Sequence, residues 1–451
     1  MDSKAQLARF GLFDADVPRY TSYPTTAQFT DTIGPDDHSA WVRAIPDGNK
    51  ISIYVHVPFC RRLCWFCAYR TQGTRNDHPI AAYLNVIKAE LALLSADLPQ
   101  GVTLSRLYWG GGTPTLLTPS MIADLTETIR AVVPFAEDTE FSVEIDPTEI
   151  DSTRLDALMH AGLSHAVIGI QDFDPLVQAA IGRIQSFDAT RDVVAELRAR
   201  SIEHISMGIL YGLPHQTPVR IAQSVHHLLS LNPDRIALYG YAHVPGIAKR
   251  QQLIPSADLP TPQERLALFQ AAQELLVWDG YSQIGVDHFC GVADGLPRAQ
   301  QTGQLRRSFQ GYTDDPADVL IGIGASAISH FPQGYTQNAP ATGAYAAAIQ
   351  AGQYATQRGH AYRGDDLMRA RVIQALMCDF SVCRARLCRD LDISAEALHR
   401  LLAEVAARFP NLLQLDEEGL TIPTEARLLT RVIARAFDGY AVDMSGHWSP
   451  F

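Results

Sequence analysis

Short apolar runs recur along residues 51–242, and each is followed by polar or glycine-rich residues and then by an amphipathic stretch with helical spacing. The runs are Ile51–Val57, Leu104–Trp109, Phe141–Ile145, Ala166–Ile170, Ile205–Leu210 and Ile236–Tyr241. The helical stretches are Ile80–Leu98, Met121–Val133, Ala189–Arg200 and Ile221–Leu231, and Asp151 and Gly162 bracket a further short one as caps. Because alternating strands and helices build a parallel sheet, the pattern predicts six strand–helix units.

Residue types that carry chemistry follow every one of these predicted strands. In parallel sheets and barrels the functional loops gather beyond the carboxyl ends of the strands. The segments in that position are Cys60–Cys67, Gly110–Thr113, Asp146-Pro147, Gln171-Asp172, Tyr211–Pro214 and Ala242-His243. We therefore expect one site, assembled from all six loops at one edge of the sheet.

The remaining chain divides by its pattern into flanking regions. We predict an N-terminal arm over residues 1–49, the barrel over 50–245, a barrel extension and substrate-side linker region over 246–362, and a helical domain over 363–451. Residues 1–50 show no regular period. A helix is expected over Thr261–Asp279, followed by a loop-rich stretch through Gly311, and the C-terminal domain should end in a hairpin-like segment, Leu412–Ile422, and a helix, Glu425–Ala436.

Composition narrows the class of protein. The 451 residues are 47% hydrophobic and 19% charged, typical of an ordinary soluble globular protein. A net charge of −12 gives no overall attraction for nucleic acid. No run of about 18 apolar residues is present, and the first ten residues lack an apolar signal core. We expect a cytoplasmic monomer with no membrane span and no nucleic-acid partner.

Cys60, Cys64 and Cys67 place three thiols within eight residues of the loop after the first strand. Seven cysteines in a chain without a secretory signal favour reduced thiols over a disulfide framework. Thiolates at this density suit an iron–sulfur cluster or zinc, but structural zinc requires four ligands and no fourth Cys or His lies nearby. A cluster held by three thiolates leaves one iron open to chelate a methionine's amino and carboxylate groups. The alternative is three buried apolar cysteines.

The Cys-x3-Cys-x2-Cys spacing after a first strand resembles the signature of the radical S-adenosylmethionine superfamily. Pro18–Thr25 resembles the N-terminal arm of the oxygen-independent coproporphyrinogen III oxidase family. Further segments fit the same family: Tyr54–Cys60, Trp109–Thr115, Glu144–Pro147, Tyr211–Pro214, Asp287–Phe289, Phe309–Tyr312 and Gly324–Ser329. The resemblance covers nearly the whole chain.

This resemblance implies a partial (βα)6 parallel barrel of the radical-SAM type, with an N-terminal arm and a C-terminal helical domain. It also implies a [4Fe–4S] cluster on Cys60, Cys64 and Cys67. A first S-adenosylmethionine would contact Tyr54, Gly111, Glu144 and Ile328, and a second would contact Phe66, Gly112, Thr113, Gln171, Arg183 and Ala242. The alternative for the glycines is a tight strand–helix turn, and for Glu144 and Arg183 it is a salt-bridged barrel rim.

The resemblance further implies the reaction. The reduced cluster would cleave S-adenosylmethionine into methionine and a 5′-deoxyadenosyl radical, which would take hydrogen from the β-carbon of a propionate. Loss of carbon dioxide and one electron leaves a vinyl group, and two such events convert coproporphyrinogen III to protoporphyrinogen IX. The partners would be a tetrapyrrole substrate and an electron donor such as a flavodoxin or ferredoxin. No catalytic residue beyond the cluster ligands is assigned.

Two positions depart from the family pattern. Tyr69 stands where these oxidases usually carry a fourth cysteine, and Gly208 stands where they have an acidic residue that contacts the second S-adenosylmethionine. An aromatic residue at the first position is similar to haem-chaperone relatives, which lack the Pro18–Thr25 arm. A haem-chaperone-like protein or a radical methyltransferase paralogue is therefore the alternative function. Gly208 predicts a weak or absent second S-adenosylmethionine site.

Overall fold

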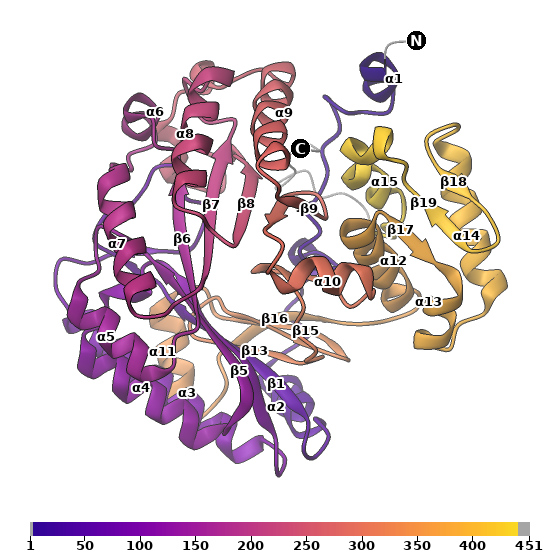
Figure 1. The fold of residues 1–451 in the computed structure, drawn as a ribbon. Helices are drawn as coiled ribbons and strands as arrows, with labels where there is room; N and C mark the ends of the chain where they lie inside the picture. Colours follow the sequence, from indigo (N-terminus) through magenta and orange to yellow (C-terminus); the bar gives the residue numbers. More distant parts are fainter. Residues whose placement is uncertain (1–2, 441–451) are drawn as a thin grey trace.

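The computed structural model describes residues 3–440 and is built around a twelve-stranded sheet (Figure 1). Six neighbouring strands of this sheet run parallel in chain order. They are β1 (Lys50–Val57), β4 (Thr103–Gly111), β5 (Phe135–Ile145), β6 (His165–Gln171), β7 (His204–Tyr211) and β8 (Arg235–Gly240). All six predicted strands are confirmed.

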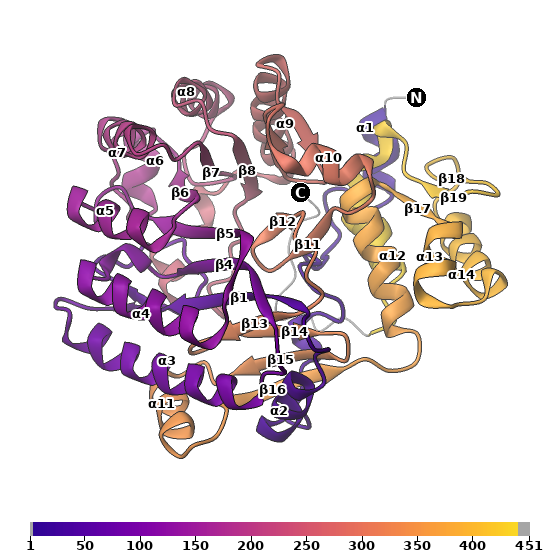
Figure 2. The same ribbon diagram turned by 60° about the horizontal axis from the view of Figure 1, so that its bottom comes forward.

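The helices between these strands cover one face of the curved sheet, as Figures 1 and 2 show. They are α3 (His78–Asp97), α4 (Pro119–Val132), α5 (Ser152–Ala161), α6 (Pro175–Ala180), α7 (Phe187–Ala199) and α8 (Pro218–Ser230). The predicted caps of α5 are confirmed, because the Asp151 side chain accepts from the Arg154 N–H and Gly162 adopts a left-handed conformation with φ of 97°. Large apolar side chains such as Trp109 and Phe141 are fully buried on this covered face.

The sheet continues beyond both edges of the parallel part. Strand β13 (Leu320–Ile323) pairs parallel to β1, and β14 (Ile328–Phe331), β15 (Gly334–Asn338) and β16 (Thr356–Ala361) follow antiparallel. At the other edge, β10 (His288–Cys290) and β9 (Ser282–Ile284) extend the sheet from β8. The sequence analysis missed these strands because each is only three to six residues long, too short to show a clear period of two.

The arm that precedes β1 contains two helices, α1 (Ser3–Arg9) and α2 (Pro35–Arg43), and the turn η1 (Thr26–Gln28). The prediction of an arm without regular structure was therefore incomplete. Helix α2 was missed because only His38 and Val42 are buried in it. Between the helices the arm runs from the barrel to the C-terminal region: Arg19 Nη2 donates to the Gly240 carbonyl at 2.5 Å, and Tyr20 donates to Asp438 at 3.0 Å.

The region after β8 is less regular and includes the predicted helix α9 (Pro262–Trp278), confirmed with Thr261 as its cap. Its other elements are η3 (Lys249–Leu253), η4 (Ser256–Asp258), α10 (Gly295–Gln301), β11 (Arg306–Ser308), β12 (Gly311–Thr313) and α11 (Thr342–Gln350). Earlier in the chain, the cysteine loop contains β2 (Phe59–Cys60) and β3 (Gln72–Gly73), and η2 (Pro114–Leu116) follows β4. The stretch expected to be loops thus holds short strands and a helix.

The C-terminal region packs beside the barrel as a helical unit with a small sheet (Figure 1). It contains α12 (Asp366–Asp379), β17 (Ser381–Cys383), α13 (Arg384–Leu391), α14 (Ala395–Arg408), β18 (Gln414–Leu415), β19 (Gly419–Thr421), η5 (Thr424–Leu429) and α15 (Thr430–Ala436). The predicted hairpin is confirmed as β18–β19, and β17 adds a third strand that was not predicted. The single helix expected over Glu425–Ala436 is instead a 3-10 turn followed by an α-helix. The domain boundaries stay a prediction.

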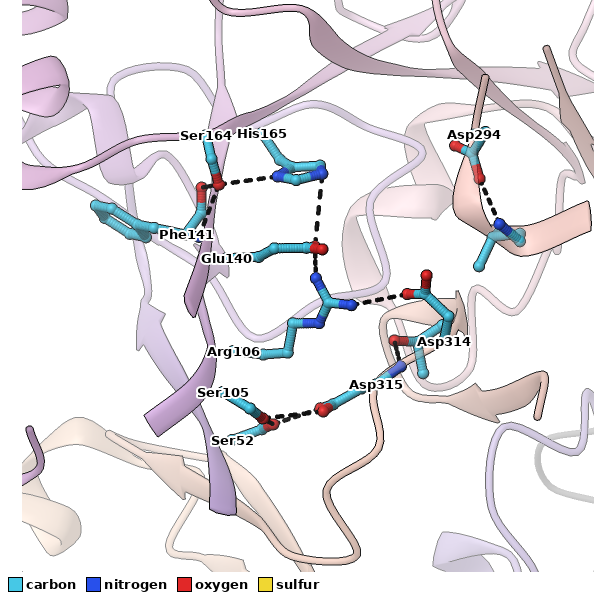
Figure 3. A network of polar contacts seen from close by, with 12 residues as sticks. Ser52, Ser105, Arg106, Glu140, Phe141, Ser164, His165, Asp294, Asp314 and Asp315 are labelled. Carbon is cyan, nitrogen blue, oxygen red and sulfur yellow. Dashed lines mark hydrogen bonds and ion pairs between the residues drawn. The ribbon is translucent and has the colours of Figure 1, made fainter. Parts of the chain in front are cut away.

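A polar network closes the amino-terminal end of the barrel interior (Figure 3). Arg106 of β4 pairs with Glu140 of β5 and, at 2.9 Å, with Asp314 from the loop after β12. The His165 ring stacks on His204 at 4.5 Å, and burial lowers the pKa of His165 to about 3. The interior therefore opens toward the carboxyl ends of the strands, where the predicted site lies.

Helix α3 is long and apolar enough to span a membrane by composition, yet it carries a buried carboxylate and packs in the core. Glu90 accepts hydrogen bonds from the Gly324 N–H at 2.8 Å, Asn338 Nδ2 at 2.7 Å and the Tyr345 hydroxyl at 2.6 Å. These contacts fasten α3 to the turn between β13 and β14. Burial raises the pKa of Glu90 to about 7.

The raised pKa of Glu90 predicts a pH-dependent stability. Between pH 4.5 and 7 the folded protein keeps a proton that the unfolded chain has lost, so the free energy of unfolding falls as pH rises through this window, by about 3 kcal/mol in total. Glu90→Gln removes this titration. The thermal midpoint of the native protein should therefore fall relative to that of Glu90→Gln between pH 5 and 7. Glu127→Gln, at an exposed position of α4, is the control; parallel midpoints for all three proteins would contradict the assignment.

Candidate functional site

The structure places the cysteine loop across the open end of the barrel. The loop leaves β1, and its two ends are joined by the short β2–β3 pair. Its middle is tied to the far side of the barrel, because the Trp65 N–H donates to the Ile181 carbonyl at 2.9 Å. Arg250 of η3 donates to the Tyr69 carbonyl at 3.3 Å and to the Thr71 hydroxyl at 2.7 Å. The loop is thus fixed by contacts from both sides of the opening.

The three thiols of this loop are half-buried and close enough to influence one another's ionisation. Burial raises the pKa of Cys60 to about 11, and the neighbouring thiols Cys67 and Cys64 raise it further, while a hydrogen bond with Thr113 acts in the opposite direction. Burial also raises the pKa of Cys67. Thiols whose pKa values are raised by burial lose their protons readily only beside a strong positive charge, such as that of a bound metal.

The arrangement fits a multi-iron cluster better than a single zinc ion. Among residues 3–440, no group of three or more His, Cys, Asp or Glu side chains converges on one point where a single ion would sit. A cubane cluster gives each thiolate its own iron, so its ligands surround the cluster without converging on one ion. The other cysteines lie elsewhere: Cys290 and Cys378 are fully buried in an apolar cluster, as expected for core packing.

Arg183, predicted for the second S-adenosylmethionine, lies beside the cysteine loop. Its Nη1 donates to Cys64 Sγ at 3.6 Å and contacts Asp146 Oδ2 at 3.5 Å. Its Nη2 donates to the Gly169 carbonyl and to Gln185 Oε1, both at 2.8 Å. The same small pocket is lined by Thr113, Cys64 and Arg183. Arg183 therefore belongs to the site and also takes part in a rim ion pair, the alternative foreseen for it.

Glu144 is the centre of the first predicted cofactor set. It lies on β5 facing the interior, where Oε2 accepts from the Gly111 N–H at 3.0 Å and Oε1 accepts from the Tyr108 hydroxyl at 3.1 Å. Burial raises its pKa, and these two hydrogen bonds oppose the effect. The sequence analysis missed Tyr108; its position two residues before Gly110, on the same face of the strand, was the available signal.

Tyr54 of β1 stands beside this carboxylate. Its ring centroid lies 5.9 Å from that of Tyr108, and its hydroxyl lies 3.0 Å from His56 Nδ1. Burial lowers the pKa of His56 to about 4, so the imidazole is neutral. Its Nε2 lies 3.4 Å from the Arg70 carbonyl, an acceptor, so Nε2 carries the proton and Nδ1 accepts from Tyr54. His56 thus orients Tyr54.

Gly111 and Gly112 are required by the fold itself. Gly111 has φ of 110°, and a Cβ there would lie 2.5 Å from the His56 ring. A Cβ on Gly112 would lie 2.6 Å from the Phe59 carbonyl oxygen. The tight-turn alternative therefore explains both glycines, while the same close approach leaves the Gly111 N–H directed at Glu144.

Phe66 and Ala242, from the second predicted set, are joined by a residue that the sequence analysis missed. Gln251 is fully buried, and its Nε2 donates to the Phe66 carbonyl at 2.8 Å and to the Ala242 carbonyl at 3.0 Å. It links the cysteine loop to the end of β8. Gln171 stands at the end of β6 with φ of 71°, next to Gly169. No local sequence signal marked Gln251.

Ile328 lies farther out than the other predicted residues. It begins β14, beside β13, and the β13 residue Gly322 is the register partner of Tyr54. The described contacts do not join its side chain to Glu144 or Gly111. The structure therefore brings Tyr54, Gly111 and Glu144 together and places Ile328 on the neighbouring edge of the same opening.

Of the two departures from the family pattern, Gly208 faces the interior and Tyr69 lies on the cysteine loop. Gly208 lies on β7 between Gly169 and Ala237 on the flanking strands, and no heavy atom lies within 4 Å of the Cβ that it lacks. The Tyr69 side chain is 68% exposed although it comes from the loop that spans the barrel. Space is therefore left at the point where the family has a carboxylate.

Comparisons with known proteins agree with this geometry. The Radical SAM superfamily profile matches residues 54–228. An oxygen-independent coproporphyrinogen III oxidase from Paracoccus denitrificans is 56% identical over 447 residues, which cover 99% of each chain, and one from Cereibacter sphaeroides is 53% identical with the same coverage. The solved coproporphyrinogen III oxidase of Escherichia coli, described as a radical SAM enzyme, superposes with a TM-score of 0.89 at 34% identity, covering 95% of this chain and 100% of that one.

These similarities extend over the arm, the barrel and the C-terminal region alike, and they confirm the predicted fold and the radical S-adenosylmethionine chemistry with its [4Fe–4S] cluster. The chain belongs to the oxygen-independent coproporphyrinogen III oxidase family of the radical SAM superfamily.

Proposed function

We propose that this protein catalyses the oxidative decarboxylation of coproporphyrinogen III to protoporphyrinogen IX without oxygen. The observation that carries the proposal is the 56% identity over 99% of both chains with a relative that bears this activity in its name. The convergence of the three cysteines, Arg183 and Glu144 at one open barrel end supports it.

Cys60, Cys64 and Cys67 would hold the cluster, which supplies reductive cleavage of S-adenosylmethionine when bound. Arg183 would offset the negative charge of the thiolates through its contact with Cys64. The Gly111 N–H and the Tyr108 hydroxyl each donate one hydrogen bond to the Glu144 carboxylate. The remaining lone pairs of the carboxylate could accept hydrogen bonds from an ammonium group or from ribose hydroxyls. The Arg106 ion pairs close the amino-terminal end of the barrel, so water does not reach the site through that end.

The assignment of cofactor residues is carried over from the family resemblance. The first S-adenosylmethionine would lie against Tyr54, Gly111 and Glu144, with Ile328 at the edge. The second would lie near Phe66, Gly112, Thr113, Gln171, Arg183 and Ala242, on the side of the opening where Gly208 leaves space. A flavodoxin or ferredoxin as electron donor, a cytoplasmic location and a monomeric state complete the proposal. The curated and structural relatives do not support the chaperone or methyltransferase alternatives.

The first test is turnover. Anaerobic incubation of reduced, cluster-loaded protein with coproporphyrinogen III, S-adenosylmethionine and an electron acceptor should give a product that has lost two carboxyl groups, detected by mass spectrometry. 5′-Deoxyadenosine without a decarboxylated porphyrin would show that the radical acts on another substrate. Stoichiometric haem binding without turnover would favour the chaperone alternative.

The cluster ligands are tested by substitution. Cys64→Ala should abolish 5′-deoxyadenosine formation, at least about a hundredfold, because a cubane needs all three thiolates. Cys388→Ala, in the C-terminal region outside the cysteine loop, is the matched control and should keep the native rate. Undiminished cleavage in Cys64→Ala would refute the ligand assignment.

Gly208 predicts the cofactor stoichiometry. Without a carboxylate on β7, the native protein should bind one S-adenosylmethionine tightly and a second weakly or not at all. Gly208→Asp should strengthen the second site by about tenfold, since the open space admits the side chain and a carboxylate accepts charge-assisted hydrogen bonds. Two sites of equal affinity in the native protein, measured by equilibrium dialysis without substrate, would contradict this.

A further inference from the structure

Arg183 is anchored by one half of its guanidinium and reaches the cysteine loop with the other half. Its Nη2 donates to the Gly169 carbonyl and to Gln185 Oε1, both at 2.8 Å, and these two contacts use both N–H groups of Nη2. Its Nη1 makes only longer contacts, at 3.6 Å to Cys64 Sγ and at 3.5 Å to Asp146 Oδ2. Nη2 is therefore the fixed end of the guanidinium, and Nη1 is the end that faces the cysteine loop.

The orientation of the Gln185 amide is set by Thr190 of α7. Gln185 Nε2 lies 3.1 Å from Thr190 Oγ1. The Thr190 hydroxyl donates its one proton to the Ser186 carbonyl at 3.2 Å, so its oxygen can only accept from Gln185. The amide nitrogen must then face Thr190, and the amide oxygen must face Arg183. A flipped amide would set its own N–H groups against those of the guanidinium, with no acceptor between them.

A second glutamine holds the main chain at Gln185. The Gln185 N–H donates to Gln178 Oε1 at 3.1 Å, and Gln178 Nε2 donates back to the Gln185 carbonyl at 2.6 Å. Gln178 Nε2 also donates to the Asp172 carbonyl at 2.8 Å, in the loop after β6. Both glutamines are buried, and a buried network whose members hydrogen-bond to one another is rigid. Residue 185 is therefore fixed relative to the end of β6.

The two arginines inside the cysteine motif are directed elsewhere. Arg61 pairs with Asp77. Arg62 donates to the Ile184 carbonyl at 3.3 Å and thereby binds the loop to its surroundings. The guanidinium that contacts a thiol of the loop comes from Arg183, which lies 119 positions farther along the chain than its thiol partner. Its placement beside the thiol therefore depends on what holds its fixed end.

We propose that Gln185 is a positioning residue: it holds the Arg183 guanidinium with Nη1 on Cys64, and this fixed positive charge raises the reduction potential of the bound cluster. The inference rests on the cluster ligands of the proposed function and is independent of the substrate. Hydrogen bonds to the ligand sulfurs and nearby charge set the potentials of iron–sulfur clusters. The reduced cluster carries one more negative charge, so a guanidinium beside it favours acceptance of an electron from a reduced flavodoxin or ferredoxin.

The experiment measures the midpoint potential of the cluster by anaerobic redox titration, with the reduced cluster followed by electron paramagnetic resonance. Gln185→Leu should make one-electron reduction about tenfold less favourable, a shift of about 59 mV to more negative potential, because Arg183 loses its acceptor and its charge moves away from Cys64. Arg183→Leu should shift the potential at least as far. The double variant should match Arg183→Leu, because Gln185 acts through Arg183. Gln300→Leu is the matched control and should keep the native potential, since Gln300 Nε2 donates to the Cys378 carbonyl outside the cysteine loop.

A second variant covers the case in which Gln185→Leu does not hold a cluster. Gln185→Glu keeps the shape and the acceptor of the side chain, and its carboxylate offsets the charge of Arg183, so it should also shift the potential downward. A native potential in these variants would overturn the inference. A double variant shifted beyond Arg183→Leu would do the same, because Gln185 would then act by another route, such as distortion of the loop.

The outcomes also separate this inference from the proposed function, because the potentials are read without coproporphyrinogen III. Unshifted potentials in a protein that decarboxylates coproporphyrinogen III would remove the inference and leave the function. The expected shifts in a protein that decarboxylates nothing would support the inference and remove the proposed substrate. Native protein whose three cysteines hold no cluster would remove both.

Discussion

The parallel alignment of β1 and β4–β8 is the constraint on which the site depends. Each strand must be followed by a crossover helix on the outer face, so all carboxyl ends open at one edge. The cysteine loop, Glu144, Arg183 and Ala242 come from four different loops or strands, and this alignment brings them to one opening. The chain thereby brings thiols, a carboxylate and a guanidinium together in one partly buried place, which suits chemistry carried by a cofactor.

The two ends of the barrel interior are built from different residues: one end is closed and the other is open. At the amino-terminal end, Arg106 pairs with both Glu140 and Asp314, and these charged side chains fill the space (Figure 3). Farther along the strands, Gly208 of β7 leaves room, because no heavy atom lies within 4 Å of the Cβ that it lacks. The N-terminal arm reaches the end of β8, where Arg19 donates to the Gly240 carbonyl.

Much of the barrel could be predicted from the sequence because its outer face is buried and apolar while its loops are polar. The strands β13–β16 could not be predicted in this way. Gly322 and Gly359, for example, lie in strands because neighbouring backbone approaches them too closely for any side chain, and this tertiary contact is not visible in the sequence. In the site, spacing revealed the cysteines and family resemblance revealed Glu144 and Arg183. Gln251 left no local signal, because it acts on a residue 185 positions away in the chain.

The central claim is that this opening directs a radical onto the propionate side chain of a tetrapyrrole. The most direct test uses coproporphyrinogen III that carries deuterium at the β-carbons of its propionates, incubated anaerobically with reduced, cluster-loaded protein, S-adenosylmethionine and an electron acceptor. We predict that deuterium appears in 5′-deoxyadenosine in proportion to the vinyl groups formed, as read by mass spectrometry. Vinyl formation with unlabelled 5′-deoxyadenosine, or cleavage of S-adenosylmethionine without any transfer of deuterium, would contradict it.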